Sequence, residues 1–468
     1  MSIKKTVAIA AAAGALAAVA MPAMAFENEI HGLYNMKYWL SNYEKGSFGA
    51  ITPGTAATAE HLRMNNYFEQ RARVFYTAKA NDDLKLVIGL EIDSVFGDRA
   101  QGGTAAFPAT RGSGGALEAD AVNIETKHVY LDFKIPSTPV KITAGIQPIK
   151  DKFKGIFFDG DIAGINSVTK VGAATLGLGY FRAYDQSYFG TGRPVGMDDL
   201  HLVALSGDFA VSKDVTVGAA YYLYADDRNT PTNIHVLGAN FDAKLGVVGL
   251  SGFAAMQQGL AKGASKTTFN GYAFNVAAKA AVGPGTLRTA ALFATGDDQR
   301  DGINTAWQSV SATQGDTAPS FAVSTYNESS MMLLNRAAQM GGSSTDNSIV
   351  YTTNNKNQGT FLLSLGYDAK LGAKAYLNGN VGMAWVSKDQ NLAGKRAKNI
   401  DVKTGGVSGT NYQGTEINVE TGYKMYDNLT VKLQAAYVML GGYYTDTVVG
   451  AKDPENPYTV RTGLSYTF

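Results

Sequence analysis

The last twelve residues of the chain, Pro457-Tyr-Thr-Val-Arg-Thr-Gly-Leu-Ser-Tyr-Thr-Phe468, contain the pattern that decides the fold. Successive side chains of a β-strand point to opposite faces, so the stretch is examined at a period of two. One face collects Tyr458, Val460, Thr462, Leu464, Tyr466 and Phe468, and the other collects Thr459, Arg461, Gly463, Ser465 and Thr467. The pattern predicts a strand with an aromatic, apolar face and a small, polar face.

Segments of roughly 10 to 14 residues with similar alternation precede this stretch, and a tilted strand needs about that length to cross a bilayer. Their connections are alternately very short and long, as in successive hairpins. The sequence therefore predicts an all-β fold, a transmembrane antiparallel β-barrel, with about 18 strands: residues 29–40, 67–80, 84–95, 123–135, 140–149, 166–173, 175–183, 199–211, 214–224, 234–245, 247–257, 269–281, 285–295, 359–371, 373–387, 414–426, 428–440 and 457–468. A misread hairpin near Ala174 would change the count, with 16 strands as the alternative.

The two faces of these segments differ in chemistry. In residues 84–95 one face is apolar and the other is largely charged: Leu84, Leu86, Ile88, Leu90 and Ile92 against Lys85, Gly89, Glu91 and Asp93. A soluble barrel would bury the apolar face, but about 18 strands enclose a lumen too wide for side chains to fill. The apolar face is therefore expected to meet lipid, and the polar face to line water.

The final strand resembles the C-terminal strand of bacterial outer-membrane β-barrels, which alternates apolar residues and closes on Phe. The resemblance implies short periplasmic turns, long extracellular loops and contact with outer-membrane lipid and lipopolysaccharide. It also implies that the barrel-assembly machinery binds the C-terminal strand through Tyr466 and Phe468. Porins of this kind form homotrimers, although nothing in the sequence requires trimer formation.

The N-terminus is typical of an export signal. Lys4 and Lys5 precede an apolar run over residues 7–20, and Ala23-Met24-Ala25 matches a small-x-small cleavage site. A cleaved signal peptide is expected over residues 1–25, followed by a single barrel domain over residues 26–468. The run is shorter than the roughly 20 residues of a spanning helix, which disfavours an uncleaved anchor.

Composition excludes several classes of function. Removing Lys4 and Lys5 leaves 39 basic residues against 40 acidic ones, so the bulk charge argues against a nucleic-acid partner. The chain contains no Cys, which excludes disulfides and thiolate metal sites. No mature segment is long and apolar enough for a spanning helix. The 53 Gly and 25 Tyr fit a barrel with aromatic interfaces and a polar interior.

The third long connection, residues 150–165, mixes Phe153, Phe157 and Phe158 with Asp159 and Asp161. Aromatic residues on a loop need a surface to pack against. In ordinal position and acidic tip, this loop resembles the third loop of general diffusion porins, which folds into the barrel and narrows it. The resemblance implies a pore constriction at Phe157, Phe158, Asp159 and Asp161, while an ordinary outward hairpin loop remains the alternative.

A basic wall is predicted where the last strand pairs with the first. The polar faces of these neighbouring strands carry Lys37, Arg71, Arg73 and Arg461, and Glu69 lies on the same face. Porins of the resembled kind set such a wall against the acidic third loop, so that a transverse field orients solutes. Solvated lumen charges with no arranged field remain the alternative.

Charges elsewhere on the predicted lumen faces nearly cancel: Lys85, Lys141, Lys279, Arg288, Lys374 and Lys432 against Glu91, Asp93, Asp132, Asp368, Glu416 and Glu420. Ion selectivity is therefore assigned to the constriction, with a weak preference for anions.

The longest loop, residues 296–358, opens with Gly296-Asp-Asp-Gln-Arg-Asp301-Gly302. Its carboxylates do not match a twelve-residue calcium loop, because Gln299 and Gln308 occupy ligand positions, so no metal is expected. The motif is similar to one in alginate-exporter-like barrels, which favours 18 strands. Residues 327–340 are predicted to be helical, with Asn327 as the cap, and to lie either across the mouth as a lid or against other loops or a partner subunit.

No catalytic motif is present. The five His residues are scattered, and none sits in a Gly-x-Ser-x-Gly or His-Glu-x-x-His setting. The sequence thus favours a porin, not an enzyme, with no cofactor, that passes small hydrophilic solutes and ions through a channel narrowed by its third loop. A substrate-specific sugar or polysaccharide channel or exporter, and an adhesive barrel with a plugged lumen, are the alternatives.

Overall fold

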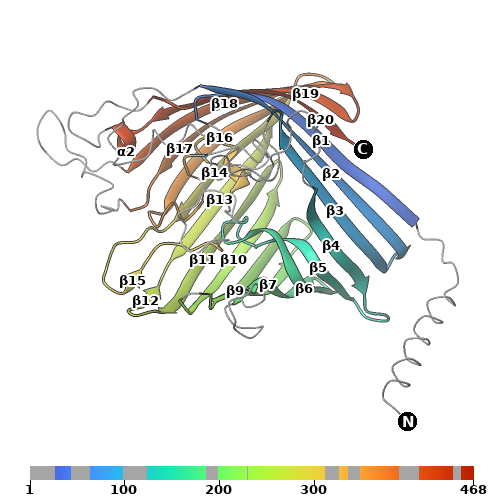
Figure 1. Cartoon of the computed structure of the whole chain (residues 1–468), viewed down its shortest axis with the longest axis vertical. Coiled ribbons are helices and arrows are strands. Elements are labelled where there is room, and N and C mark those ends of the chain that lie inside the picture. The colour runs from blue at the N-terminus through green and yellow to red at the C-terminus, as the bar shows by residue number, and fades with distance from the viewer. Residues whose placement is uncertain are drawn as a thin grey trace, which may run out of the picture.

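A computed structural model describes residues 27–43, 64–97, 124–185, 199–228, 230–310, 326–335, 348–350, 352–388, 411–445 and 455–468. Its wall consists of 18 long antiparallel strands (Figure 1): β1 (Glu27–Ser41), β2 (Asn65–Asn81), β3 (Leu84–Val95), β4 (Glu125–Lys134), β5 (Val140–Lys150), β6 (Asp159–Val171), β7 (Ala174–Asp185), β8 (Asp199–Ala210), β9 (Val215–Asp226), β10 (Thr232–Leu245), β11 (Val248–Lys262), β13 (Tyr272–Val282), β14 (Gly285–Ala294), β16 (Thr360–Lys370), β17 (Ala375–Trp385), β18 (Tyr412–Tyr426), β19 (Leu429–Leu440) and β20 (Tyr458–Thr467). The predicted count of 18 is confirmed.

Each long strand pairs with its neighbours in sequence, and β1 also pairs with β20, which closes the ring. At this seam the backbone of Gly32 exchanges hydrogen bonds with that of Phe468, with N···O distances of 2.9 and 3.1 Å. Figure 1 shows the C-terminus beside β1 and β20. Two short strands, β12 (Lys266–Phe269) and β15 (Ile303–Asn304), add a small parallel pair. The predicted signal peptide lies outside the described residues.

The two faces of the wall have the predicted polarity. On β18, Ile417 and Val419 point outward and are 55% and 40% exposed, whereas Glu416 and Asn418 point inward and are 0% and 2% exposed. The same alternation exposes Leu, Val, Ile and aromatic side chains around the outside of the other strands. A closed barrel has no unpaired strand edge, and an apolar outer band can contact lipid. The wall is therefore built to cross a membrane.

Tight turns join the strands at one end of the barrel. Gly172 and Gly246 have φ of 59° and 63° in two of these turns, a conformation that glycine adopts without strain. Most connections at the opposite end are long, as predicted, although residues 227–231 alone join β9 to β10. Within the described residues, α2 (Gly442–Thr445) is the α-helix, and no helix there is long and apolar enough to cross a membrane.

The β5–β6 hairpin leaves the wall before it ends. Pairing of β4 with β5 stops at Ile146, and pairing of β6 with β7 stops at Ala163, but β5 and β6 remain paired up to Lys150 and Asp159. Gly145, with φ of 130°, lies where the hairpin departs, and the tip projects inside the ring of strands (Figure 1). The prediction of a loop over residues 150–165 was therefore wrong, because residues 159–165 pair with β5 as a regular strand.

The predicted helix over residues 327–340 is also wrong where the structure describes it. Only the 3-10 helix η4 (Asn327–Ser329) forms, and Ser330 then takes a left-handed φ of 54°. Residues 336–340 lie outside the described part of the chain. The apolar residues of this segment are instead buried inside the barrel, where Met331 to Leu334 are all 2% exposed or less.

Candidate pore and solute path

The third loop, residues 151–158, folds into the lumen and packs against the inner wall. Phe153 lies 5.7 Å from the ring of Tyr222 on β9 and 5.6 Å from that of Phe253 on β11, measured between centroids. Phe157 and Phe158 are only 1% and 3% exposed. These two predicted constriction residues thus anchor the loop, and the surface they present to passing solutes is small.

A single carboxylate organises the loop backbone. Asp151 is buried, and its two oxygens accept the N–H groups of Phe153, Gly155, Phe157 and Phe158 at 2.5 to 3.1 Å. Burial raises the pKa of Asp151 to about 6, while the four N–H donors favour the carboxylate and oppose that effect. The loop is therefore wrapped around its own first residue, a role that sequence reasoning did not assign.

The predicted acidic pair lies at the start of β6. Asp159 is bound by Lys150 across the hairpin at 2.8 Å. Asp161 accepts a hydrogen bond from Lys127 Nζ at 2.7 Å and lies 2.9 Å from His128 Nε2. Lys127 and His128 both lie near the start of β4. Because the hairpin bends inward, Asp161 faces the inner side of β4, and these contacts join the hairpin to the wall.

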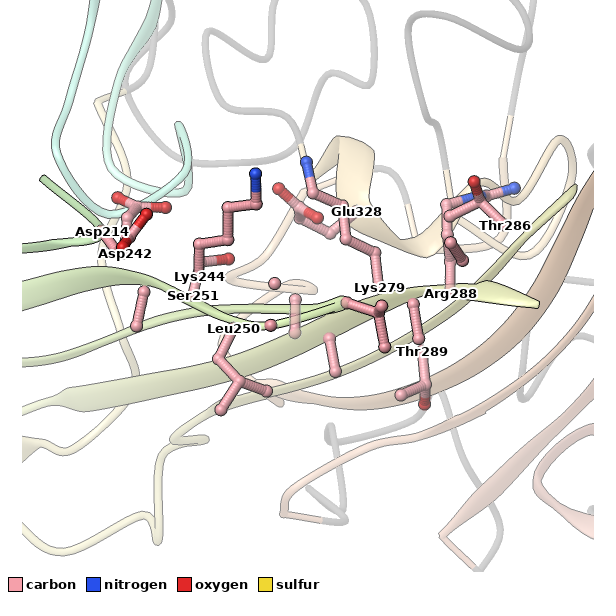
Figure 2. Close-up of a pocket in the computed structure, with 18 of the residues that line it drawn as sticks. Asp214, Asp242, Lys244, Leu250, Ser251, Lys279, Thr286, Arg288, Thr289 and Glu328 are labelled. Carbon is pink, nitrogen blue, oxygen red and sulfur yellow. The ribbon is translucent and has the colours of Figure 1, made fainter.

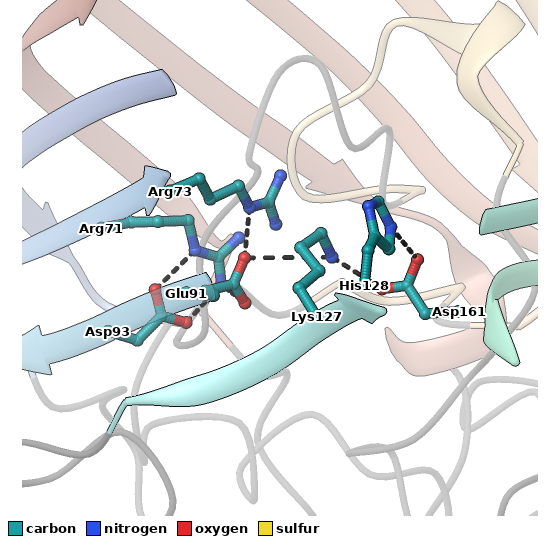
Figure 3. Close-up of polar contacts among 7 residues, drawn as sticks. All are labelled: Arg71, Arg73, Glu91, Asp93, Lys127, His128 and Asp161. Carbon is teal, nitrogen blue, oxygen red and sulfur yellow. Dashed lines mark hydrogen bonds and ion pairs between the residues drawn. The ribbon is translucent and has the colours of Figure 1, made fainter. Parts of the chain in front are cut away.

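The predicted basic residues Arg71 and Arg73 on β2 face acidic partners on β3 (Figure 3). Arg71 binds Asp93 through two hydrogen bonds at 2.6 and 2.5 Å, and Arg73 binds Glu91. Lys127 then lies 3.9 Å from Glu91 and links this row to Asp161. Arg71 also lies 3.8 Å from Glu91. The result is a charge ladder of alternating sign on one side of the lumen, Asp93, Arg71, Glu91, Lys127 and Asp161, with Arg73 bound to Glu91 beside it.

Arg461 and Lys37 occupy a separate cluster at the barrel seam. The Arg461 guanidinium lies 4.1 Å from the Trp39 ring centroid, and Lys37 Nζ lies 5.4 Å from it. Arg461 is 1% exposed, and Trp39 stacks on Tyr67 at 5.7 Å. The structure therefore places the four predicted basic residues in two groups, and their joint role in selectivity stays a prediction.

Part of the longest loop also lies inside the barrel and meets the third loop. The backbone oxygen of Ile156 accepts Trp307 Nε1, Ser309 Oγ and Thr353 Oγ1 at 2.7 to 3.3 Å. Val310 N–H donates to the oxygen of Phe157 at 2.9 Å. The sequence did not predict this contact, since no pattern in the loop signals an interaction with residues about 150 positions earlier.

A cavity of about 790 Å³ lies between the inner face of β9 to β14 and the two inward loops, which contribute Lys154 and Glu328 to its lining. Figure 2 shows Glu328 and Lys279 converging across it, with Arg288 farther along the wall. Its charged lining residues are Lys154, Lys213, Lys244, Lys279 and Arg288 against Asp214, Asp242 and Glu328. The lining therefore carries an excess of positive charge, although Asp368, at 2.5 Å, neutralises Arg288.

No group of three or more His, Asp or Glu within the described residues is arranged to hold a metal ion. In the acidic loop, Asp297 accepts the N–H groups of Gln299 and Thr305, and Asp298 binds Arg300. These carboxylates serve the loop's own conformation.

The comparisons with known proteins agree with this geometry. No family model matches the sequence, and no curated protein is detectably similar to it. Among solved structures, the chain is similar to the Pseudomonas aeruginosa outer membrane protein OpdK, with 10% identity, a TM-score of 0.55, and coverage of 94% of this chain and 98% of that one. It is also similar to OccK8 (OprE) of the same organism, with 11% identity, a TM-score of 0.54, and coverage of 94% and 98%.

A third similar structure is OccK2 (OpdF) of Pseudomonas aeruginosa in complex with glucuronate, with 13% identity, a TM-score of 0.51, and coverage of 94% and 98%. A further OpdK structure contains vanillate. At such low identity the likeness establishes the fold, and the chain has a porin-like barrel. The predicted fold, a transmembrane-type antiparallel β-barrel like that of porins, is confirmed.

Proposed function

We propose that the protein is an outer-membrane channel through which small hydrophilic solutes and ions diffuse passively. The observation that carries the proposal is the combination of an apolar outer band with an inner face of paired charges, which suits a wall between lipid and water. The third loop and residues 304–310 and 326–335 narrow the lumen. Passage is then restricted by size at these segments and by charge at the ladder.

Single-channel recording in a planar bilayer tests this function. Ohmic conductance steps from purified, folded protein are expected, with a modest reversal potential under a salt gradient because both signs line the lumen. Folded and inserted protein that gives no steps would contradict the channel and favour a plugged barrel that works through its loops.

A second candidate is a channel selective for small anionic solutes. The small lysine excess around the 790 Å³ cavity favours it, because four lysines, Lys244 and Lys279 among them, line that space against three carboxylates. Two similar structures contain vanillate or glucuronate, each a carboxylate, which agrees with this proposal.

Liposome swelling distinguishes the two candidates. Glucose and glucuronate have similar size and differ in charge, so a general channel passes them at similar rates. Faster swelling with glucuronate, lost in Lys244→Gln/Lys279→Gln, is expected of the anion-selective channel. Equal rates in wild type would contradict anion selectivity and leave general diffusion.

We further propose that the barrel contacts outer-membrane lipid and lipopolysaccharide through its apolar band, and that the assembly machinery binds its C-terminal strand. Homotrimer formation is proposed on the porin-like fold alone. Native mass spectrometry in detergent measures it, and a monomeric mass would contradict it.

A further inference from the structure

Residues 326–335 of the longest loop contact side chains of the wall that face inward. Asn275 on β13 donates to the Tyr326 hydroxyl at 2.5 Å. Arg288 on β14 donates to Ser330 Oγ at 2.6 Å, and Asn418 on β18 donates to the Ser330 carbonyl at 3.0 Å. The neighbours of these wall residues in sequence, Phe274 and Ile417 among them, are exposed on the outside. The segment therefore lies within the lumen.

One carboxylate holds the centre of this segment. Glu416 on β18 is 0% exposed, and its oxygens accept the consecutive N–H groups of Met332, Leu333 and Leu334 at 2.6 to 2.9 Å. Asn418 Nδ2 supports the same carboxylate at 2.7 Å. Within the described residues Glu416 has no ion-pair partner, so N–H donors alone stabilise its charge. Charge-assisted hydrogen bonds of this kind are the stronger ones in proteins.

The wall also provides a steric recess for the segment. The side chain of Met331 lies over Gly382 on β17, in the space that a Cβ at position 382 would occupy. Leu333 and Leu334 are completely buried. Beyond η4 the described part of the segment has no helical hydrogen bonding. Its position depends on these wall contacts and on residues 349 and 350, whose N–H groups donate to the carbonyl oxygens of Leu333 and Leu334 at 2.7 and 2.9 Å.

We propose that residues 329–335 form an internal gate segment and that Glu416 is the positioning residue that keeps it docked. When the three N–H groups lose their acceptor, the segment leaves the recess at Gly382 and the channel widens. This inference rests on the proposed channel function and specifies how the bore of that channel is set.

The first test compares two isosteric charge removals on the same strand face. Glu416→Gln keeps the side-chain size but directs an amide N–H toward the loop N–H groups, so the gate segment is released and larger conductance steps are expected. Glu420→Gln removes an equal charge two positions along that face, where Glu420 binds Tyr376 and Gln434 and not the loop. It is expected to conduct as wild type does.

A disulfide between the gate segment and the wall should reverse the effect of Glu416→Gln. The chain has no Cys, so Met331→Cys/Gly382→Cys introduces the sole pair. Under oxidising conditions this pair fixes the gate segment to the wall, and adding Glu416→Gln should not increase conductance. Reduction should restore the increase. A change in conductance caused by general damage to the barrel would not respond to the redox state of this pair.

Labelling of Met331→Cys with a membrane-impermeant maleimide measures docking without relying on current. Faster labelling in the Glu416→Gln background supports the gate segment, and equal rates overturn it. If wild-type protein gives no conductance at all, the channel function fails, while the labelling rates still decide whether Glu416 docks the segment. If Glu416→Gln does not fold, Asn418→Ala removes the contact to Ser330 and provides the same comparison.

Equal conductance of folded wild type, Glu416→Gln and Glu420→Gln also overturns the inference.

Discussion

At the scale of single residues, Asp151 is the clearest determinant of the third loop. Replacement by Ala leaves four buried N–H groups without their acceptor, and each such loss costs about 1–3 kcal/mol. We expect Asp151→Ala to release the loop from the inner wall and to increase single-channel conductance. Asp159→Asn, which removes a more exposed carboxylate bound to Lys150, serves as the control and should have a smaller effect.

The charge ladder gives a second prediction at the residue scale. Neutralising Arg71 and Arg73 to Gln leaves Asp93 and Glu91 without their principal cations, so the reversal potential should shift toward cations. The variant Arg71→Gln/Asp93→Asn removes both members of one pair and should shift it little. An unchanged reversal potential in Arg71→Gln/Arg73→Gln would show that the permeant ions do not sense this wall.

At the scale of elements, the inward bend of the β5–β6 hairpin depends on Gly145. Its φ of 130° disfavours any L side chain, and a Cβ there would meet the Val129 carbonyl oxygen. Gly145→Ala is expected to reduce the folded fraction, measured as the heat-modifiable band on a gel. Gly379→Ala, where a Cβ has open space, is the matched control and should fold normally. Equal folded fractions would mean that the bend tolerates a side chain.

The Gln147 side chain provides hydrogen bonds to backbone carbonyl groups at this bend. Its Nε2 lies 3.0 to 3.3 Å from the carbonyl oxygens of Thr143, Gly145 and Gly164, where the ladder is interrupted, and the residue is 2% exposed. A buried carbonyl without a partner is costly in a membrane protein, so this side chain compensates for the departure of the hairpin. From the sequence alone, Gln147 was one more residue at the end of a strand.

At the scale of the whole molecule, alternation and hairpin spacing predicted the barrel, its strand count and its inward and outward faces. These features depend on local periodicity, which the sequence contains directly. The interior was predicted less well. The turn after β2 fixes the register that pairs Arg71 with Asp93, so part of the ladder was accessible by counting. The docking of Met332 on Glu416 joins residues 84 positions apart and has no local signature.

Closure of the barrel gives the last prediction, because it depends on a fit between the two ends of the chain. The Phe468 ring lies beside Gly32, and a Cβ added to Gly32 would be 2.6 Å from Phe468 Cζ. The Phe468 ring also stacks on the Tyr466 ring, with 5.7 Å between centroids. Phe468→Ala removes the ring from this slot, while Gly32→Ala displaces it and also approaches the Arg73 carbonyl. Both changes should lower the yield of closed, heat-modifiable barrel.

The two variants separate closure from recognition by the assembly machinery. In refolding from urea into detergent no machinery is present, so a defect of Phe468→Ala there reports the seam itself. Tyr466→Phe keeps an aromatic ring beside Phe468 and is the control that should refold as wild type does. If both Gly32→Ala and Phe468→Ala refold normally, the Gly32 slot contributes nothing to closure, and any loss seen only in cells belongs to recognition of the C-terminal strand.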